Sequence, residues 1–83
     1  MVVDPVYHKI IINDEKESIN FYARSIGVWQ QMIQKEEDEI QKQYFQYFMD
    51  VDIIELENAN ERLEKFRGEL TRYELSQREL LAV

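Results

Sequence analysis

The sequence contains no cysteine, which excludes a disulfide framework, a thiolate zinc site and thiol chemistry. Two glycines and one proline among 83 residues leave few turn formers and no glycine-rich phosphate-binding loop. No stretch approaches the roughly 20 consecutive apolar residues of a membrane span. The first residues include Asp4 and Pro5 where a signal peptide carries basic residues and an apolar core. We therefore expect a cytoplasmic, helix-rich protein that does not associate with membranes.

Positive charge is also scarce, since ten Lys and Arg residues face 17 Asp and Glu residues and the net charge is −7. The acidity is concentrated in residues 36–61, which carry nine acidic residues and one lysine. Binding to DNA or RNA requires a concentrated positive surface, so nucleic acid is not expected as a partner. The acidic middle is expected either to keep an assembly soluble or to meet a basic surface on another protein.

Residues that could carry catalytic or metal chemistry are few and isolated. His8 is the single histidine, has no acidic or histidine residue at ligand spacing, and is expected at the surface. The acidic residues 36–39 cannot all point at one ion from a helix, and no Asp/Asn loop with a central glycine is present. The Glu-x-x-His pattern of di-iron bundles is absent. The sequence therefore predicts a non-enzymatic protein without a metal site or cofactor.

The strongest structural signal is residues 40–56, where ten of 17 residues are apolar or aromatic. Placed at about 100° per residue, they fall into two stripes on opposite sides of one helix. The first stripe contains Ile40, Tyr44, Tyr47, Phe48, Val51 and Ile54, and the second contains Phe45, Met49, Ile53 and Leu56. A helix that is apolar on two sides is buried on two sides. This helix is therefore predicted to be covered by two other elements of its chain, or by its own chain and a second copy.

The two stripes differ in length, which suggests which of them faces the chain's own core. The first stripe is longer and stays in phase with Ile33, whereas the second fades at both ends. We therefore expect the first stripe to face the core and the second stripe to face a second copy.

Residues 1–13 are predicted to form an extended arm. The run from Ile10 to Ile12 is β-branched, and Pro5 disfavours helical geometry in the preceding residue. The first helix is expected to begin at Asn13 or Asp14, either of which can act as N-cap. Gly27 lies inside this helix, and the helix is expected to continue through it because the apolar spacing stays in phase.

Two possible boundaries between helices are less well defined. At residues 36–39, a helix break and a solvated turn of a long helix are equally consistent with the sequence, because no glycine, proline or asparagine forces a break. At residues 57–60, Asn58 can cap a new helix, and a turn is favoured over a stutter in a continuous helix. A regular 3-4 repeat follows, consisting of Leu56, Ala59, Leu63, Phe66, Leu70, Tyr73, Gln77 and Leu80.

The sequence therefore predicts one all-α domain over residues 1–83, with two or three long amphipathic helices and an extended N-terminal arm. The helices are expected at residues 14–36, 38–57 and 59–81, packed as a hairpin or bundle in a coiled-coil-like manner, with continuity across these boundaries left open. The expected function is that of a small acidic protein–protein interaction module (adaptor, regulator or structural component) that forms a homodimer or higher homo-oligomer. The expected interface residues are Trp29, Tyr44, Phe45, Phe48, Met49, Ile53 and Leu56.

Two other functions fit parts of the sequence. An acidic inhibitor could occupy a basic groove of a nucleic-acid enzyme, with the carboxylates of residues 36–39, Asp50, Asp52, Glu55 and Glu57 in place of phosphates. A ribbon-helix-helix DNA binder would pair residues 6–12 as a strand across a dimer, but the acidity of the chain opposes DNA binding.

Overall fold

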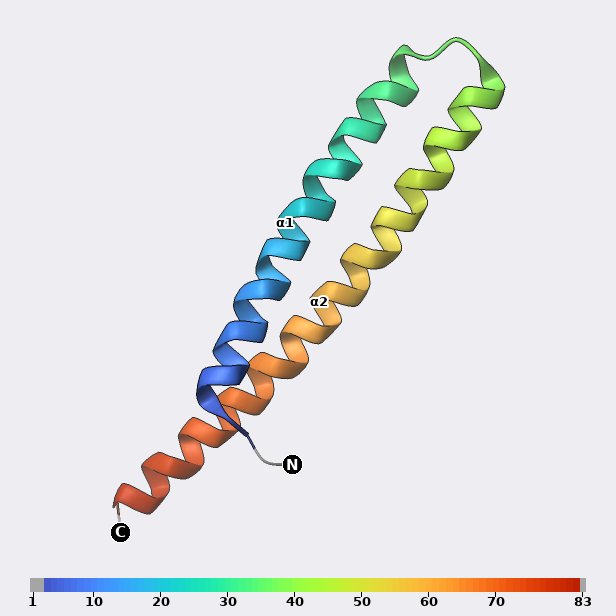
Figure 1. The fold of residues 1–83 in the computed structure, drawn as a ribbon. Helices are drawn as coiled ribbons and strands as arrows, with labels where there is room; N and C mark the ends of the chain where they lie inside the picture. The colour runs from blue at the N-terminus through green and yellow to red at the C-terminus, as the bar shows by residue number, and fades with distance from the viewer. Residues whose placement is uncertain (1–2, 83) are drawn as a thin grey trace.

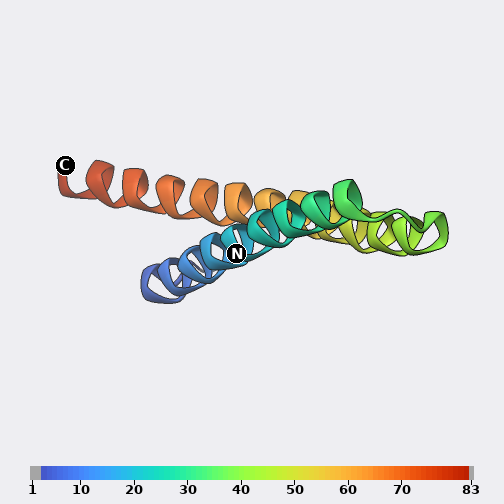
Figure 2. The same ribbon diagram turned by 90° about the horizontal axis from the view of Figure 1, so that it is seen from above.

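The computed structural model describes residues 3–82 as two antiparallel α-helices joined by a short loop (Figure 1). Helix α1 spans Pro5–Lys35 and helix α2 spans Glu39–Ala82. The molecule is a rod of 68 × 17 × 16 Å, and seen from above the two helices cross each other (Figure 2). The all-α prediction is confirmed. The described residues contain two helices, so the third helix is not formed there.

Helix α1 begins earlier than predicted, because Asp4 and Pro5 together form a helix start. Asp4 is the N-cap, and its carboxylate accepts hydrogen bonds from the backbone N–H groups of Val6 at 3.0 Å and Tyr7 at 3.2 Å. Pro5 occupies the first turn, where its missing N–H leaves no bond unmade. The predicted extended arm is therefore wrong for residues 5–13, and residues 1–2 lie outside the described part.

Three consequences follow from this early helix start. Asn13 and Asp14 are not caps, because both lie inside α1. The strand that a ribbon-helix-helix protein would need at residues 6–12 is not formed, because these residues are helical. The prediction that the helix continues through Gly27 is confirmed.

The acidic residues 36–39 form the hairpin loop and the start of α2. Asp38 caps α2, since its Oδ1 accepts hydrogen bonds from the N–H groups of Ile40 at 2.9 Å and Gln41 at 3.3 Å. The Glu36 carboxylate accepts a bond from the N–H of Asp38 at 3.1 Å. Carboxylates satisfy backbone donors and suit the positive end of a helix, so this loop forms without glycine or proline.

Helix α2 continues through residues 57–60, so the prediction of a turn there is wrong. Asn58 is an exposed mid-helix residue and caps nothing. A single 3-4 repeat of shielded residues runs along α2, which we call the α2 seam: Phe45, Met49, Asp52, Leu56, Ala59, Leu63, Phe66, Leu70 and Tyr73. The phase therefore does not change at residue 57, because the second stripe of residues 40–56 is the beginning of this seam.

Helix α1 presents a matching repeat to α2, which we call the α1 seam: His8, Ile12, Glu15, Ile19, Tyr22, Ile26, Trp29 and Ile33. The core between the two seams is thin. Its buried apolar residues are Ile12, Ala59 and Leu63, and most other seam residues are half-buried. Two helices enclose the small side chain of Ala59 but fully bury no large one among the described residues, so this fold leaves much of its apolar surface in water.

Candidate interaction surface

The first stripe of residues 40–56 lies mostly in water, although its Phe48 also packs on Trp29 of α1. We call it the outer stripe: Ile40, Tyr44, Tyr47, Phe48, Val51 and Ile54, with exposed fractions from 39% to 67%. The expectation that this stripe faces the chain's own core is therefore wrong. The second stripe packs against α1 because it stays in phase with the rest of α2, from Leu56 to Tyr73. The stripe that packs against α1 is the one whose spacing stays in phase along the whole length of α1. The length of each stripe within residues 40–56 does not decide this.

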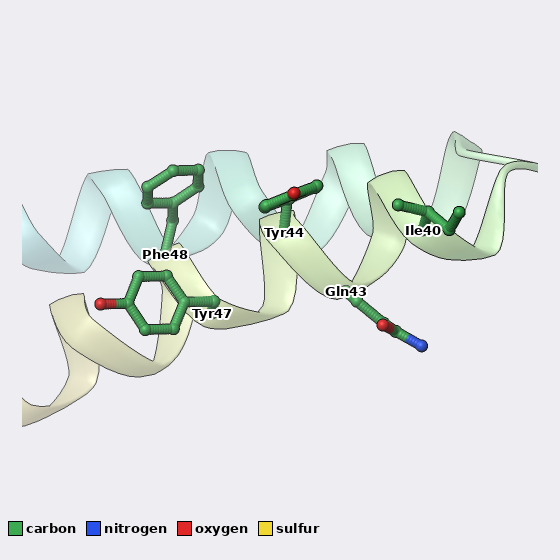
Figure 3. Close-up of a pocket in the computed structure, with 5 residues that line it drawn as sticks. All are labelled: Ile40, Gln43, Tyr44, Tyr47 and Phe48. Atoms are coloured by element: carbon green, nitrogen blue, oxygen red, sulfur yellow. The ribbon is translucent and has the colours of Figure 1, made fainter.

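A groove of about 530 Å³ lies over the loop-proximal part of the outer stripe. It is lined by Ile40, Gln43, Tyr44, Tyr47 and Phe48 (Figure 3). In Figure 3, the side chains of Ile40, Tyr44 and Phe48 project from the same side of α2, whereas Gln43 points away from them. The groove is therefore mainly an aromatic surface with one polar edge.

An aromatic cluster connects this surface to the interior of the hairpin. The indole of Trp29 stacks on Phe48 with ring centroids 5.3 Å apart, and the Phe45 ring lies 5.7 Å from it. Tyr47 meets Phe48 edge to face at 5.7 Å. Phe48 is therefore held in place by Trp29 on one side while 45% of it is exposed. Rings that are already held lose little conformational freedom when a partner covers them.

The predicted interface residues fall into two groups. Phe45, Met49, Ile53 and Leu56 are half-buried in the hairpin. Tyr44 and Phe48 lie on the exposed outer stripe, and Trp29 connects the two groups. The structure thus brings Trp29, Phe45 and Phe48 together, and the interface itself stays a prediction.

Three polar residues of the seams, His8, Glu15 and Asp52, each link the two helices. His8 Nε2 lies 2.8 Å from Glu69 Oε2, and Arg62 Nε donates to Glu15 Oε1 at 2.8 Å. Asp52 accepts hydrogen bonds from the Ser25 hydroxyl and, at 3.0 Å, from the Trp29 indole N–H.

Asp52 occupies a seam position that an apolar residue would normally fill. Its Oδ2 accepts both the Ser25 and the Trp29 bond, which satisfies a carboxylate that is shielded from water. Sequence reasoning assigned no role to Ser25. The available signal was the position of Asp52 inside an otherwise apolar repeat, since a carboxylate there requires donors from the facing helix.

The three links share one antiparallel register. Moving one heptad along α1 from His8 to Glu15 is matched by one heptad back along α2 from Glu69 to Arg62. Ten residues further along α1, from Glu15 to Ser25, are matched by ten residues back along α2, from Arg62 to Asp52. A shift of the helices by one turn would separate all of these partners at once. The polar seam residues therefore specify the alignment of the hairpin.

His8 is not a surface residue as expected, because only 4% of it is exposed. Its Nδ1 donates to the carbonyl oxygen of Asp4 at 3.0 Å, and its ring packs edge to face against Phe66 at 5.6 Å. A carbonyl and a carboxylate are both acceptors. The ring of His8 therefore lies between two acceptors, the Asp4 carbonyl oxygen and the Glu69 carboxylate.

The Arg62–Glu15 link is more exposed than the His8–Glu69 link. The hydrogen bond from Arg62 to Glu15 raises the pKa of the guanidinium above its ordinary value, because the bond favours the charged form. The second oxygen of Glu15 is buried and has no hydrogen-bond partner among the described residues. This link therefore aligns the helices without fully satisfying its carboxylate.

The acidic residues proposed as phosphate substitutes do not form one free surface. Asp52 is engaged by α1, and the carboxylates of Glu36 and Asp38 accept backbone hydrogen bonds in the loop. Asp50 accepts a bond from Gln46 at 2.8 Å on the exposed face. In residues 3–82 no group of three or more His, Asp or Glu side chains is placed to hold a metal ion.

Neither helix in the described part of the chain has the length and apolarity needed to cross a membrane. In comparisons with known proteins, no family model, no curated protein and no solved structure matches the chain.

Proposed function

We propose that this protein is a non-enzymatic protein–protein interaction module that self-associates through the outer stripe of α2. The observation that carries the proposal is the exposure of six large apolar side chains in one contiguous stripe. Exposed apolar patches of this kind, rimmed by polar residues, are typical of interaction sites. Tyrosine and tryptophan are also enriched where interfaces derive most of their binding energy.

The total surface of the chain supports a partner of substantial size. The hairpin exposes 6519 Å². A compact monomer of 10.1 kDa would expose about 5,300 Å², so the surplus is about 1,200 Å² per chain. A standard protein–protein interface buries about 800 Å² per partner, and homodimers often bury more. The surplus is therefore of the size that a homodimer would remove from water.

The acidic-inhibitor alternative has weaker support. It requires carboxylates that are free to replace phosphates, and Asp52 already accepts two hydrogen bonds from α1. A basic protein surface could still meet the exposed Asp50 and Glu57, so this alternative predicts salt-dependent capture of a basic partner. Self-association through an apolar stripe predicts little dependence on salt.

Sedimentation equilibrium in the micromolar range tests the proposal. We expect a dimer or larger species whose mass changes little between low and high salt. The double substitution Tyr44→Ser with Tyr47→Ser should shift the mass toward the monomer while helical circular dichroism is retained, because both rings are exposed in the hairpin. The control is Gln31→Ser with Gln34→Ser, at exposed positions of α1. A monomeric wild-type protein at every concentration would refute self-association.

A further inference from the structure

We propose that two copies pack through their outer stripes in antiparallel orientation, about a two-fold axis that passes through Tyr47. In this arrangement each α2 lies between its own α1 and the α2 of the second copy. The inference rests on the proposed self-association and adds to it the identity, the direction and the register of the occupant.

The spacing of the outer stripe indicates that its occupant is a helix. Ile40, Tyr44, Tyr47, Val51 and Ile54 follow one another at intervals of four, three, four and three residues. This spacing keeps a stripe facing a second helix over several turns, and the α2 seam uses the same spacing against α1. The groove therefore continues along α2 as a helix-binding face.

A second copy supplies a helix with the same repeat. A two-fold axis places one surface against itself, so the stripe must fit its own reversed image. Ile40, Tyr47 and Ile54 are seven residues apart, which makes the stripe symmetric about Tyr47. Reversal places Ile40 over Ile54 of the second copy and Tyr44 near Val51 of the second copy. Apolar residues thus meet apolar residues along the whole stripe.

Charge selects the antiparallel direction over the parallel one. A parallel pair would place the two acidic loops, residues 36–39, side by side, with four carboxylates from each chain. In the antiparallel pair the loops lie about 28 Å apart along the axis, at about 1.5 Å per helical residue. This separation exceeds the Debye length of about 8 Å at physiological ionic strength.

The level at which each loop meets the second copy carries both signs of charge. Glu55, Glu57 and Glu61 of α2 lie there, followed by Arg62, which is bonded to Glu15. The antiparallel pair therefore replaces a contact between two loops of four carboxylates each with a contact to a stretch that holds three carboxylates and one arginine.

Disulfide trapping tests the direction directly, because the native chain has no cysteine. The three positions are exposed in the hairpin, so Ile40→Cys, Tyr47→Cys and Ile54→Cys should leave its fold intact. Under mild oxidation we expect Tyr47→Cys to form a covalent dimer with itself. Ile40→Cys alone should not, because its two copies lie about 21 Å apart, beyond the roughly 7 Å between Cα atoms that a disulfide can span. An equimolar mixture of Ile40→Cys and Ile54→Cys should form the mixed dimer.

The control and the opposing outcomes separate this inference from the proposed function. Asn60→Cys, exposed on α2 outside the stripe, should not cross-link. If sedimentation shows a dimer and Ile40→Cys cross-links to itself, the antiparallel arrangement is overturned. Self-association would still hold in that case. A dimer that links at none of the three positions would place the contact on another surface and overturn the inference as well. A monomer by sedimentation would refute the proposed function itself. If Tyr47→Cys weakens association, the Ile40→Cys and Ile54→Cys mixture decides, since it keeps Tyr47.

Discussion

His8 and Glu69 are separated by 61 positions in the sequence, yet His8 Nε2 and Glu69 Oε2 are 2.8 Å apart near the open end of the hairpin. The side chains of both residues are largely shielded, with 6% and 10% exposed. A polar pair removed from water contributes to stability only while both members are present, because the remaining partner would be buried without a bond. The pair therefore makes the end of the hairpin dependent on one specific contact.

We expect Glu69→Leu to lower the free energy of unfolding by about 1–3 kcal/mol, because it leaves the His8 Nε2 buried without a partner. Glu69→Gln should lower it less, since the amide can still bond the ring. Urea denaturation followed by helical circular dichroism measures the difference. The control is Glu64→Gln, an exposed side chain in a 3.7 Å surface contact with Arg67, which should change stability by less than about 0.5 kcal/mol. Equal effects of Glu69→Leu and Glu64→Gln would contradict the role of the pair.

Asp52→Ala should lower the free energy of unfolding by about 1–3 kcal/mol, because it removes the acceptor shared by the Trp29 indole and the Ser25 hydroxyl. Trp29 is the single tryptophan, so its fluorescence should report the loss of this bond locally. Asp50→Ala serves as the matched control, because Asp50 is exposed and its carboxylate accepts a bond from Gln46 of the same helix. A larger effect at Asp50 than at Asp52 would show that the seam contact is not important for stability.

The two stripes of α2 should respond differently to an introduced charge. Met49→Asp places a carboxylate in the α2 seam and should destabilise the hairpin by about 3 kcal/mol. Val51→Asp places it on the outer stripe and should leave a folded chain with weakened self-association. Circular dichroism and sedimentation of both variants at one protein concentration measure fold and mass, with Asn60→Asp as the exposed control. If Val51→Asp unfolds the chain and Met49→Asp only weakens self-association, the outer stripe faces the core, as the sequence alone predicts.

Asp4→Ala should lower stability by about 1 kcal/mol, because the N-cap accepts two backbone hydrogen bonds at the start of α1. Asp14→Ala should have little effect, because Asp14 is an exposed residue inside the helix. Comparison of the two variants distinguishes a helix that begins at Pro5 from one that begins near Asn13. Chemical denaturation of the two variants gives the comparison, and a larger loss at Asp14 would support the later start.

The helical class was predictable because the apolar residues repeat at helical spacing and glycine and proline are rare. The start of α1 was missed for a local reason. Pro5 disfavours helix only in Asp4, whose extended geometry is what an N-cap needs, and the β-branched residues that follow favour a strand only as a propensity. β-branched residues such as Ile12 are tolerated in a helix when packing buries them.

The choice between the two stripes was not accessible from residues 40–56 alone, because both stripes are apolar there. It depends on the alignment of two helices that are 31 and 44 residues long. Three polar residues within the seams, His8, Glu15 and Asp52, interrupt the apolar pattern and conceal this alignment in the sequence. The aromatic residues of the interaction surface were identified, but the side of α2 that remains open could be assigned only when α1 was in place.

The loop joins α1 and α2 at one end, and nothing covalent holds the other end. Separation of the helices should therefore begin at the open end and proceed turn by turn toward the loop. Amide hydrogen exchange should accordingly slow in steps from Tyr7 toward Trp29, with the His8–Glu69 contact as the first barrier to opening. The last turns of α2 extend beyond α1 (Figure 1), so their amides should exchange at the rate of an isolated helix.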